Sequence, residues 1–332
     1  MKRNNLFQFA TSELSQDAFI CWLMNFASKK HQHEDLILSE CAKEILSMFI
    51  QSKEDVVVTK ISKQYKNIDV LIEVNDKYNI IIEDKTFTNI HDNQINTYKQ
   101  TLTDEKRNNI ICVYYKIIEQ PFEEKNVVNV TRKDLINWFS KYVDRTSNII
   151  FKDYYDYLLS IESSVNKYKT EPIKNWLHHN GHAYKGFFTH LIENRIVRLD
   201  RSYGWQYVAN PSGGMQALWW YNLTQEELKR CNLSTEYLSN MYLQIENNII
   251  AVKIKGNTEK SNSIRWSLYS YIKEQVPYFN KKTFRNGQWM TVGYIEYDEK
   301  NYREKIELME RVMESIANGD YKYNESMKVD LS

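Results

Sequence analysis

Two acids and a lysine, Asp69, Glu83 and Lys85, are the residues whose types and spacing most suggest chemistry. They belong to the segment 67–85, NIDVLIEVNDKYNIIIEDK, which alternates like two paired strands. In that pairing Asp69 lies directly opposite Glu83, with Lys85 diagonal to both. Directly opposed residues have Cβ atoms about 4.5–5.5 Å apart, so two carboxylates there repel each other and need a cation. Lys85 could supply one charge and Mg²⁺ the rest, and water bound to such a metal can hydrolyse a phosphodiester.

The predicted hairpin that positions these residues consists of strands Ile68–Val74 and Tyr78–Lys85. The link between them, Asn75-Asp76-Lys77, is suited to a three-residue turn. A turn centred on Asp76 sets the register, and a one-residue slip would move Asp69 to the other face. The expected cross-strand pairs are Val74 with Tyr78, Ile72 with Ile80, and Val70 with Ile82.

Asp69, followed across the turn by Glu83-Asp84-Lys85, resembles the D…(D/E)xK signature of the PD-(D/E)XK nuclease superfamily. Ile68 stands where the signature carries proline, a departure that many members share. The resemblance covers roughly residues 6–116 and says nothing direct about the remainder.

Two further stretches resemble motifs of the RecB-like branch of that superfamily. Gln94-Ile-Asn-Thr-Tyr98 looks like its QxxxY element, and the opening TSELSQDAF, with Glu13, looks like its helical acidic motif. Gln94 and Tyr98 share a helical face, which is either an ordinary polar surface or a face turned to the metal site. In the second case Gln94 helps to order water or the nucleic-acid backbone, and Tyr98 stacks or donates to phosphate. His91 could touch phosphate, but a solvated position near the helix start is more typical.

The resemblance implies a Mg²⁺ site in which Mn²⁺ substitutes. Asp69 and Glu83 would bind the metal together with the backbone carbonyl of Asp84, whose side chain points to the opposite face. Glu13 would hold a metal-bound water, with Asp17 one turn further on as the fallback. Acids at these two positions otherwise complement the helix dipole at a solvated end.

Periodicity predicts an α/β arrangement for the first half. The expected elements are helices at 15–29 and 36–50, a strand at 56–63, the hairpin, a helix at 89–102 and a strand at 110–115. This is the order of a restriction-endonuclease-like αβββαβ core, a mixed sheet flanked by helices, with one extra helix in front. Further on, Thr131 is expected to N-cap a helix through Lys141, with Asp134 at the capping-box position.

Composition limits the function classes. The 332 residues carry a net charge of only +1, and the halves differ slightly, at −3 for residues 1–165 and +4 for 166–332. No general polycation is present, although a local basic surface is compatible with these totals. Four scattered cysteines without CxxC spacing favour free thiols in a reducing cytoplasm. No run of 18 apolar residues exists, so a membrane helix is not expected.

The second half has a different character. All nine glycines lie at or after Gly181, and six of the eight tryptophans lie at or after Trp176. We therefore expect two domains: 1–165, resembling a PD-(D/E)XK nuclease, and 166–332, an α+β domain that recognises a substrate or a protein partner or activator. One hairpin there is expected on an Asn247-Asn248 turn.

Three groups of side chains in the second half need weighing. A group of histidines could bind a metal, but its pattern is more typical of a polar turn. A group of arginines could contact phosphates, but its spacing is more typical of a solvated helix face. A third group interleaves bases and aromatics, which suits stacking on single strands, although tryptophans in such a domain are more often core. The groups are His178, His179 and His182; Arg195, Arg198 and Arg201; and Trp266, Lys281, Lys282, Arg285 and Trp289.

These observations together predict a cytoplasmic, metal-dependent nuclease. Lys85 would orient or deprotonate the attacking water and offset charge on the phosphate. DNA is favoured over RNA as the substrate, because it is the commonest substrate in the resembled superfamily. A role in prokaryotic phage defence is inferred by analogy with members of that superfamily. The alternatives are a catalytically silent nucleic-acid- or protein-binding module, and a structural salt-bridge cluster in which Lys85 pairs with both carboxylates without metal. The oligomeric state is left open.

Overall fold

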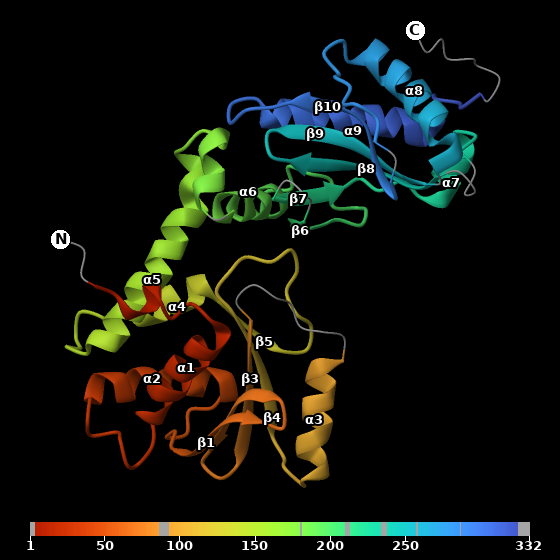
Figure 1. Cartoon of the computed structure of the whole chain (residues 1–332). Coiled ribbons are helices and arrows are strands. Elements are labelled where there is room, and N and C mark those ends of the chain that lie inside the picture. Colours follow the sequence, from red (N-terminus) through yellow and green to blue (C-terminus); the bar gives the residue numbers. More distant parts are fainter. Residues whose placement is uncertain are drawn as a thin grey trace. The chain divides into compact units, whose positions relative to one another are not determined.

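The computed structural model describes residues 4–85, 93–179, 181–209, 213–233, 238–256, 258–285 and 287–324. The chain divides into two compact units, Met1–Ser164 and Val165–Ser332, each with its own five-stranded sheet (Figure 1). None of the described helices combines the length and the apolar character needed to cross a membrane.

The first unit is a mixed α/β structure. Its sheet has the strand order β1-β2-β3-β4-β5, in which β1, β2 and β3 are antiparallel neighbours and β3, β4 and β5 are parallel ones. The strands are β1 (Val58–Tyr65), β2 (Ile68–Val74), β3 (Tyr78–Lys85), β4 (Ile110–Lys116) and β5 (Val128–Thr131). The helices are η1 (Leu6–Gln8), α1 (Glu13–Asn25), α2 (Leu36–Ile50), α3 (Gln94–Asp104), α4 (Arg132–Ser140) and α5 (Ile149–Val165).

The expected hairpin register is confirmed. Val74 pairs with Tyr78, Ile72 with Ile80, and Val70 with Ile82. Asn75 and Asp76 take positive φ angles of 55° and 51°, which Asn and Asp tolerate better than most residues, and they close the three-residue turn. The bounds of both strands are those expected from the alternation.

Helices cover both faces of this sheet. On one face α1 packs Phe19 beneath Tyr154 of α5, with ring centroids 3.7 Å apart, over the side of β3 that carries Ile82. On the other face α3 lies with Tyr98 in a small cluster with Ile81 of β3. Side chains alternate along β3, so Asp84 points to the α1 side while Glu83 and Lys85 point to the α3 side.

The expected bounds of α1 and β1 need correction. Helix α1 begins at Glu13 rather than Ser15, because Ser12 is the N-cap and accepts a hydrogen bond from the Ser15 N–H. Strand β1 spans Val58–Tyr65, two residues later than expected. The expected start of the third helix and His91 fall in 86–92, outside the described residues. The Thr131 capping box is confirmed.

The second unit is built on an antiparallel sheet in the order β10-β9-β8-β7-β6. Apolar side chains of the sheet, among them Leu243, Val252 and Val292, enter a large core that is shared with helices. The expected Asn247-Asn248 turn is confirmed, since Glu246 pairs with Ile249. The strands are β6 (Gly204–Val208), β7 (Met215–Trp220), β8 (Leu238–Glu246), β9 (Ile249–Gly256) and β10 (Trp289–Glu296). The helices are η2 (Asn166–Lys169), η3 (Ile173–His179), α6 (His182–Glu193), α7 (Gln225–Arg230), α8 (Thr258–Gln275) and α9 (Tyr302–Asn318).

Candidate active site

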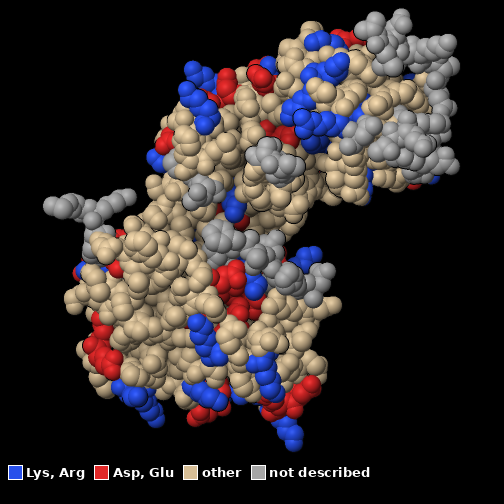
Figure 2. Space-filling view, viewed as in Figure 1, with Lys and Arg blue, Asp and Glu red and all other residues tan. Residues whose placement is uncertain are grey.

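Asp69, Glu83 and Lys85 meet at the end of the β2–β3 hairpin. The Lys85 Nζ lies 2.6 Å from Glu83 Oε1 and 3.9 Å from Asp69 Oδ2. Asp69 also accepts a hydrogen bond of 3.3 Å from the backbone N–H of Asp84. The register of the hairpin therefore brings the two carboxylates and the lysine together as the alternation indicates. Figure 2 shows acidic side chains gathered in this part of the first unit.

Glu83 is the most buried of the three. Its side chain is fully buried, and among the described residues its Oε2 atom has no hydrogen-bond partner. Burial raises the pKa of Glu83 to about 7, Lys85 opposes that shift, and the nearby charge of Asp69 adds to it. The site therefore holds a carboxylate whose negative charge is only partly compensated by protein groups.

Two opposing effects act on the pKa of Lys85. Burial lowers the pKa of its ammonium group, but the carboxylates of Glu83 and Asp69 outweigh burial and raise the pKa above its usual value. Lys85 is therefore positively charged at neutral pH.

Gln94 and Tyr98 connect α3 to this cluster. The Gln94 Nε2 donates to Glu83 Oε1 at 2.7 Å and to the Tyr98 hydroxyl at 2.5 Å. The ring of Tyr98 is buried, so its hydroxyl is the part of this residue that faces the site. The pair therefore lies on the face of α3 that is turned toward Glu83.

Helix α1 brings two further acids to the same region. Glu13 is the first helical residue and is partly buried, and its charge affects the pKa of Lys85. Asp17 is buried, and burial, followed by the charge of Asp69, raises its pKa to about 6. Among the described residues the Oδ1 atom of Asp17 has no hydrogen-bond partner. Asp17, considered only as a fallback, is thus the more deeply placed of the two acids.

The Asp84 side chain points away from Glu83 to the α1 face, as the alternation predicts. It accepts a short hydrogen bond from Gln16 Nε2 of α1, and Gln16 Oε1 accepts one of 2.9 Å from the Tyr154 hydroxyl. Burial raises the pKa of Asp84 well above its ordinary value. Asp84 therefore ties β3 to α1 through its side chain.

Gln64 is a neighbour of the site that the motifs do not indicate. Its Nε2 donates to Asp69 Oδ1 at 3.2 Å, and its side chain lowers the pKa of Asp17, partly offsetting the effect of burial. Gln64 has a φ of 53°, an uncommon backbone conformation for this residue type. A tight Lys66-Asn67 turn, in which both φ angles are positive, places Gln64 across from Asp69. The signal available in the sequence was Asn67 just before a strand, a turn residue of β-hairpins.

The residues present fit a divalent cation. The buried Oε2 atom of Glu83 has no hydrogen-bond partner among the described residues, and Asp69 and Glu13 add negative charge around Lys85. In the described ranges, no group of three or more His, Cys, Asp or Glu side chains is arranged to hold a metal ion by itself. Mg²⁺ is commonly held by one or two carboxylates and several waters, so an all-oxygen donor set of this kind suits it.

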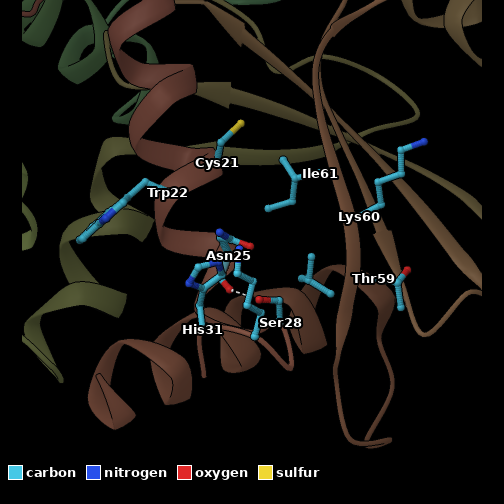
Figure 3. A pocket seen from close by; sticks show the side chains of 10 residues that line it. Cys21, Trp22, Asn25, Ser28, His31, Thr59, Lys60 and Ile61 are labelled. Atoms are coloured by element: carbon cyan, nitrogen blue, oxygen red, sulfur yellow. Dashed lines mark hydrogen bonds between the residues drawn. The ribbon is translucent and has the colours of Figure 1, made fainter. Parts of the chain in front are cut away.

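A separate pocket of about 450 Å³ lies between α1 and β1 (Figure 3). Ile61 of β1 points toward α1, while Thr59 and Lys60 point away from it. Cys21 lines the pocket, and burial raises the pKa of its thiol to about 11, so the thiol is protonated at neutral pH. None of the described residues that line this pocket is a carboxylate, so it differs in chemistry from the site at the end of the β2–β3 hairpin.

The histidine and arginine groups of the second unit have other roles. His178 is exposed in η3, His182 begins α6, and the described residues provide no metal-binding group around them. Arg198 pairs with Glu314, and Arg201 pairs with Glu227 at 2.7 Å. These two arginines therefore form ion pairs within the unit and do not lie on a solvated helix face.

A family model described as the PD-(D/E)XK nuclease superfamily matches residues 4–171, just over half of the chain. The chain belongs to this superfamily, a group of nucleases that act on nucleic acids and typically use divalent metals. The mixed sheet flanked by helices is consistent with that assignment. No curated protein and no solved structure matches the chain.

Proposed function

We propose that this protein is a Mg²⁺-dependent nuclease whose active site is formed by Asp69, Glu83 and Lys85. The observation that carries the proposal is their convergence at the end of one hairpin in a chain of this superfamily. Mn²⁺ would substitute for Mg²⁺, since both prefer oxygen ligands. We also propose that the αβββαβ order is the core of the fold and that the chain belongs to the RecB-like branch.

Asp69 and Glu83 would hold the cation with the backbone carbonyl of Asp84, and Glu13 would hold a water of its hydration shell. The buried Asp17 is an alternative to Glu13 in this role. A bound divalent cation supplies charge stabilisation at phosphate oxygens and lowers the pKa of water. For Glu83 to take part, its proton must leave, which its pKa of about 7 allows at neutral pH.

Lys85 would act through its positive charge. Because the carboxylates raise the pKa of its ammonium group, orientation of water and stabilisation of charge on the phosphate are favoured over removal of a proton. Gln94 would fix the orientation of Glu83 through its 2.7 Å hydrogen bond, and Tyr98 would in turn fix Gln94. The hydrogen bonds from α3 thus position a ligand rather than take part in bond breaking.

DNA is proposed as the substrate ahead of RNA, and phage defence as the setting, both by analogy with the superfamily. The second unit is proposed to recognise the substrate, or a protein partner or activator. None of the active-site residues described above distinguishes the 2′-hydroxyl of RNA.

The test is cleavage of circular duplex DNA, linear duplex DNA, single-stranded DNA and RNA, each with Mg²⁺, Mn²⁺ or EDTA. We expect metal-dependent cutting that Asp69→Asn and Lys85→Gln reduce by about a hundredfold or more, since each removes a charge at the reacting phosphate. Product lengths on gels provide the measurement, and the circular substrate separates endonuclease from exonuclease action.

Matched control variants lie in the turn of the same hairpin. Asp76→Asn and Lys77→Gln change the same residue types at exposed positions and should leave cutting unchanged. If no substrate is cut and Mg²⁺ does not shift thermal stability, the enzyme proposal fails and the silent binding module takes its place. Stabilisation by Mg²⁺ that depends on Asp69, without cutting, would indicate a competent site that needs an activator.

A further inference from the structure

A basic and aromatic pocket of about 380 Å³ lies within the second unit, at the start of β10. Arg265 of α8 forms one wall, and Lys282 and Arg285 come from the segment that precedes β10. Trp289 and Thr291 of β10 form another wall. The pocket combines guanidinium, ammonium and indole groups, and none of them belongs to the carboxylate site of the first unit.

The pocket continues onto the polar face of the sheet. Trp289 pairs with Lys255 of β9, and Thr291 pairs with Lys253, which in turn pairs with Tyr242 of β8. The intervening side chains point to the opposite face and enter the core. Figure 2 shows basic side chains gathered over this region of the second unit.

Trp289 is prominent on this surface because half of it, 50%, is exposed. Lys255 Nζ lies 4.9 Å from the indole centroid, and the ring of Tyr242 meets the indole edge-on at 5.6 Å. The indole is therefore held in place by neighbours while much of its surface faces solvent. The expectation that Trp289 and Trp266 belong to the core is wrong for Trp289, and Trp266 is only partly buried.

The basic charge of this surface is incompletely neutralised. Glu246 is buried and lies 3.2 Å from Lys253 and 3.7 Å from Lys282, so its charge is shared by two lysines. Within the described part of the chain, no carboxylate pairs with Lys255 or Arg285. Lys281, in the same segment, lies 3.7 Å above the ring of Trp266 instead of meeting an acid.

We propose that this pocket binds a single-stranded stretch of nucleic acid, with a base stacked on Trp289 and phosphates held by Lys255, Lys282 and Arg285. The inference deepens the proposed function and rests on it, because the nuclease proposal identifies the bound polymer as nucleic acid. An exposed, pre-positioned indole beside uncompensated cations is the combination that single strands use, because every base has a flat face and every linkage a negative charge. Paired bases in a duplex do not expose these faces.

The experiment measures binding, not cleavage. The full chain, carrying Asp69→Asn and kept in EDTA, is titrated into a fluorescein-labelled oligothymidine of about 12 nucleotides, and anisotropy is followed. We expect Trp289→Ala to weaken binding about 5- to 100-fold and Trp289→Phe to retain most of the affinity, because phenylalanine keeps a stacking ring. Lys255→Gln and Arg285→Gln should each reduce the slope of log affinity against log salt by about 0.7.

A matched pair elsewhere in the unit provides the control. Tyr278 is 43% exposed and Lys305 Nζ lies 4.0 Å from its ring, but neither lines the pocket. Tyr278→Ala and Lys305→Gln should therefore leave the affinity unchanged. Circular dichroism of each variant establishes that an affinity change is not a folding defect.

Several outcomes would overturn the pocket proposal. The proposal fails if Trp289→Ala binds with unchanged affinity or if a hairpin duplex binds as tightly as the single strand. It also fails if polyaspartate competes fully, a result that would indicate an acidic peptide as the ligand. An oligouridine titration compares RNA with DNA. A chain that binds through Trp289, cuts nothing and is not stabilised by Mg²⁺ would keep this proposal and remove the nuclease. A chain that cuts but binds independently of Trp289 would do the reverse.

Discussion

At the scale of single residues, three influences act on the protonation of Glu83. Burial favours a proton on its carboxyl, Lys85 favours the charged form, and a bound cation would favour it further. With a pKa of about 7, Glu83 changes charge across the neutral range, where an ordinary glutamate has long been ionised.

This raised pKa predicts how stability depends on pH in EDTA. A group whose pKa is higher in the folded state contributes stability below its unfolded pKa, near 4.5, and loses it as pH rises through about 7. Glu83→Gln removes this loss, so the variant should be more stable than wild type at pH 8 by about 1–3 kcal/mol, with the difference shrinking toward pH 5. Urea denaturation at both pH values measures it. A less stable variant at pH 8 would show that the ion pair with Lys85 outweighs burial and would support the structural salt-bridge interpretation.

Addition of Mg²⁺ should stabilise the wild-type protein in a way that depends on pH. The cation competes with the proton at Glu83, so we expect Mg²⁺ to raise the melting temperature of the wild type at pH 8 and to do so less at pH 6. Asp69→Asn should reduce the effect, and Asp76→Asn should preserve it. A melting-temperature shift that is the same at both pH values would show that cation binding does not depend on the protonation of Glu83.

At the scale of elements, α1 is joined to β3 by a buried hydrogen-bond chain. Asp84 accepts from Gln16, Gln16 accepts from Tyr154, and the Tyr154 hydroxyl lies 3.0 Å from that of Tyr115. The chain fixes the position of the helix that carries Glu13 against the strand that carries Glu83.

Gln16→Ala should therefore destabilise the protein. It removes the hydrogen bonds from Gln16 to the buried Asp84 carboxyl and from the Tyr154 hydroxyl to Gln16, which costs about 1–3 kcal/mol in the free energy of unfolding. Chemical denaturation measures this loss. Gln100→Ala, an exposed glutamine on α3, should change stability by less than about 0.5 kcal/mol. Equal effects of the two substitutions would contradict a role for the buried chain.

Local signals explain which elements the sequence could predict. The β2–β3 hairpin and its register followed from alternation and a turn of Asn and Asp, and the Thr131 helix followed from its capping box. The proximity of Asp69, Glu83 and Lys85 could be predicted because one hairpin holds all three. Gln64 escaped prediction because its role depends on an unusual φ in a neighbouring strand.

Contacts between distant segments were beyond these local signals. The hydrogen bond from Gln16 to Asp84 joins residues on separate elements, and its partner Tyr154 comes from a third. In the second unit, the hairpin expected on the Asn247-Asn248 turn is confirmed, but periodicity does not give the order of the strands in the sheet. The exposure of Trp289 likewise depends on how β10 lies beside β9.

At the scale of the whole molecule, each unit has its own sheet, and the second has a large core of its own. Val165 packs against Gly186, where a Cβ would meet the Val165 carbonyl oxygen at 2.3 Å, so this contact belongs to the second unit. A fragment spanning 165–332 should therefore unfold cooperatively by itself, as followed by circular dichroism in guanidinium. A featureless, gradual loss of signal would show that the second unit depends on the first.

The order of strands in the first sheet also bears on how the chain folds. Strands β1, β2 and β3 form a continuous meander with short turns, whereas β4 and β5 join by parallel pairing after longer connections, the first of which contains α3. Contacts between near neighbours in sequence form fastest, so the meander is a natural folding nucleus. We expect Asn67→Ala, in the β1–β2 turn, to slow refolding more than it speeds unfolding in stopped-flow experiments. The carboxylates and the lysine would then be assembled before the rest of the sheet is complete.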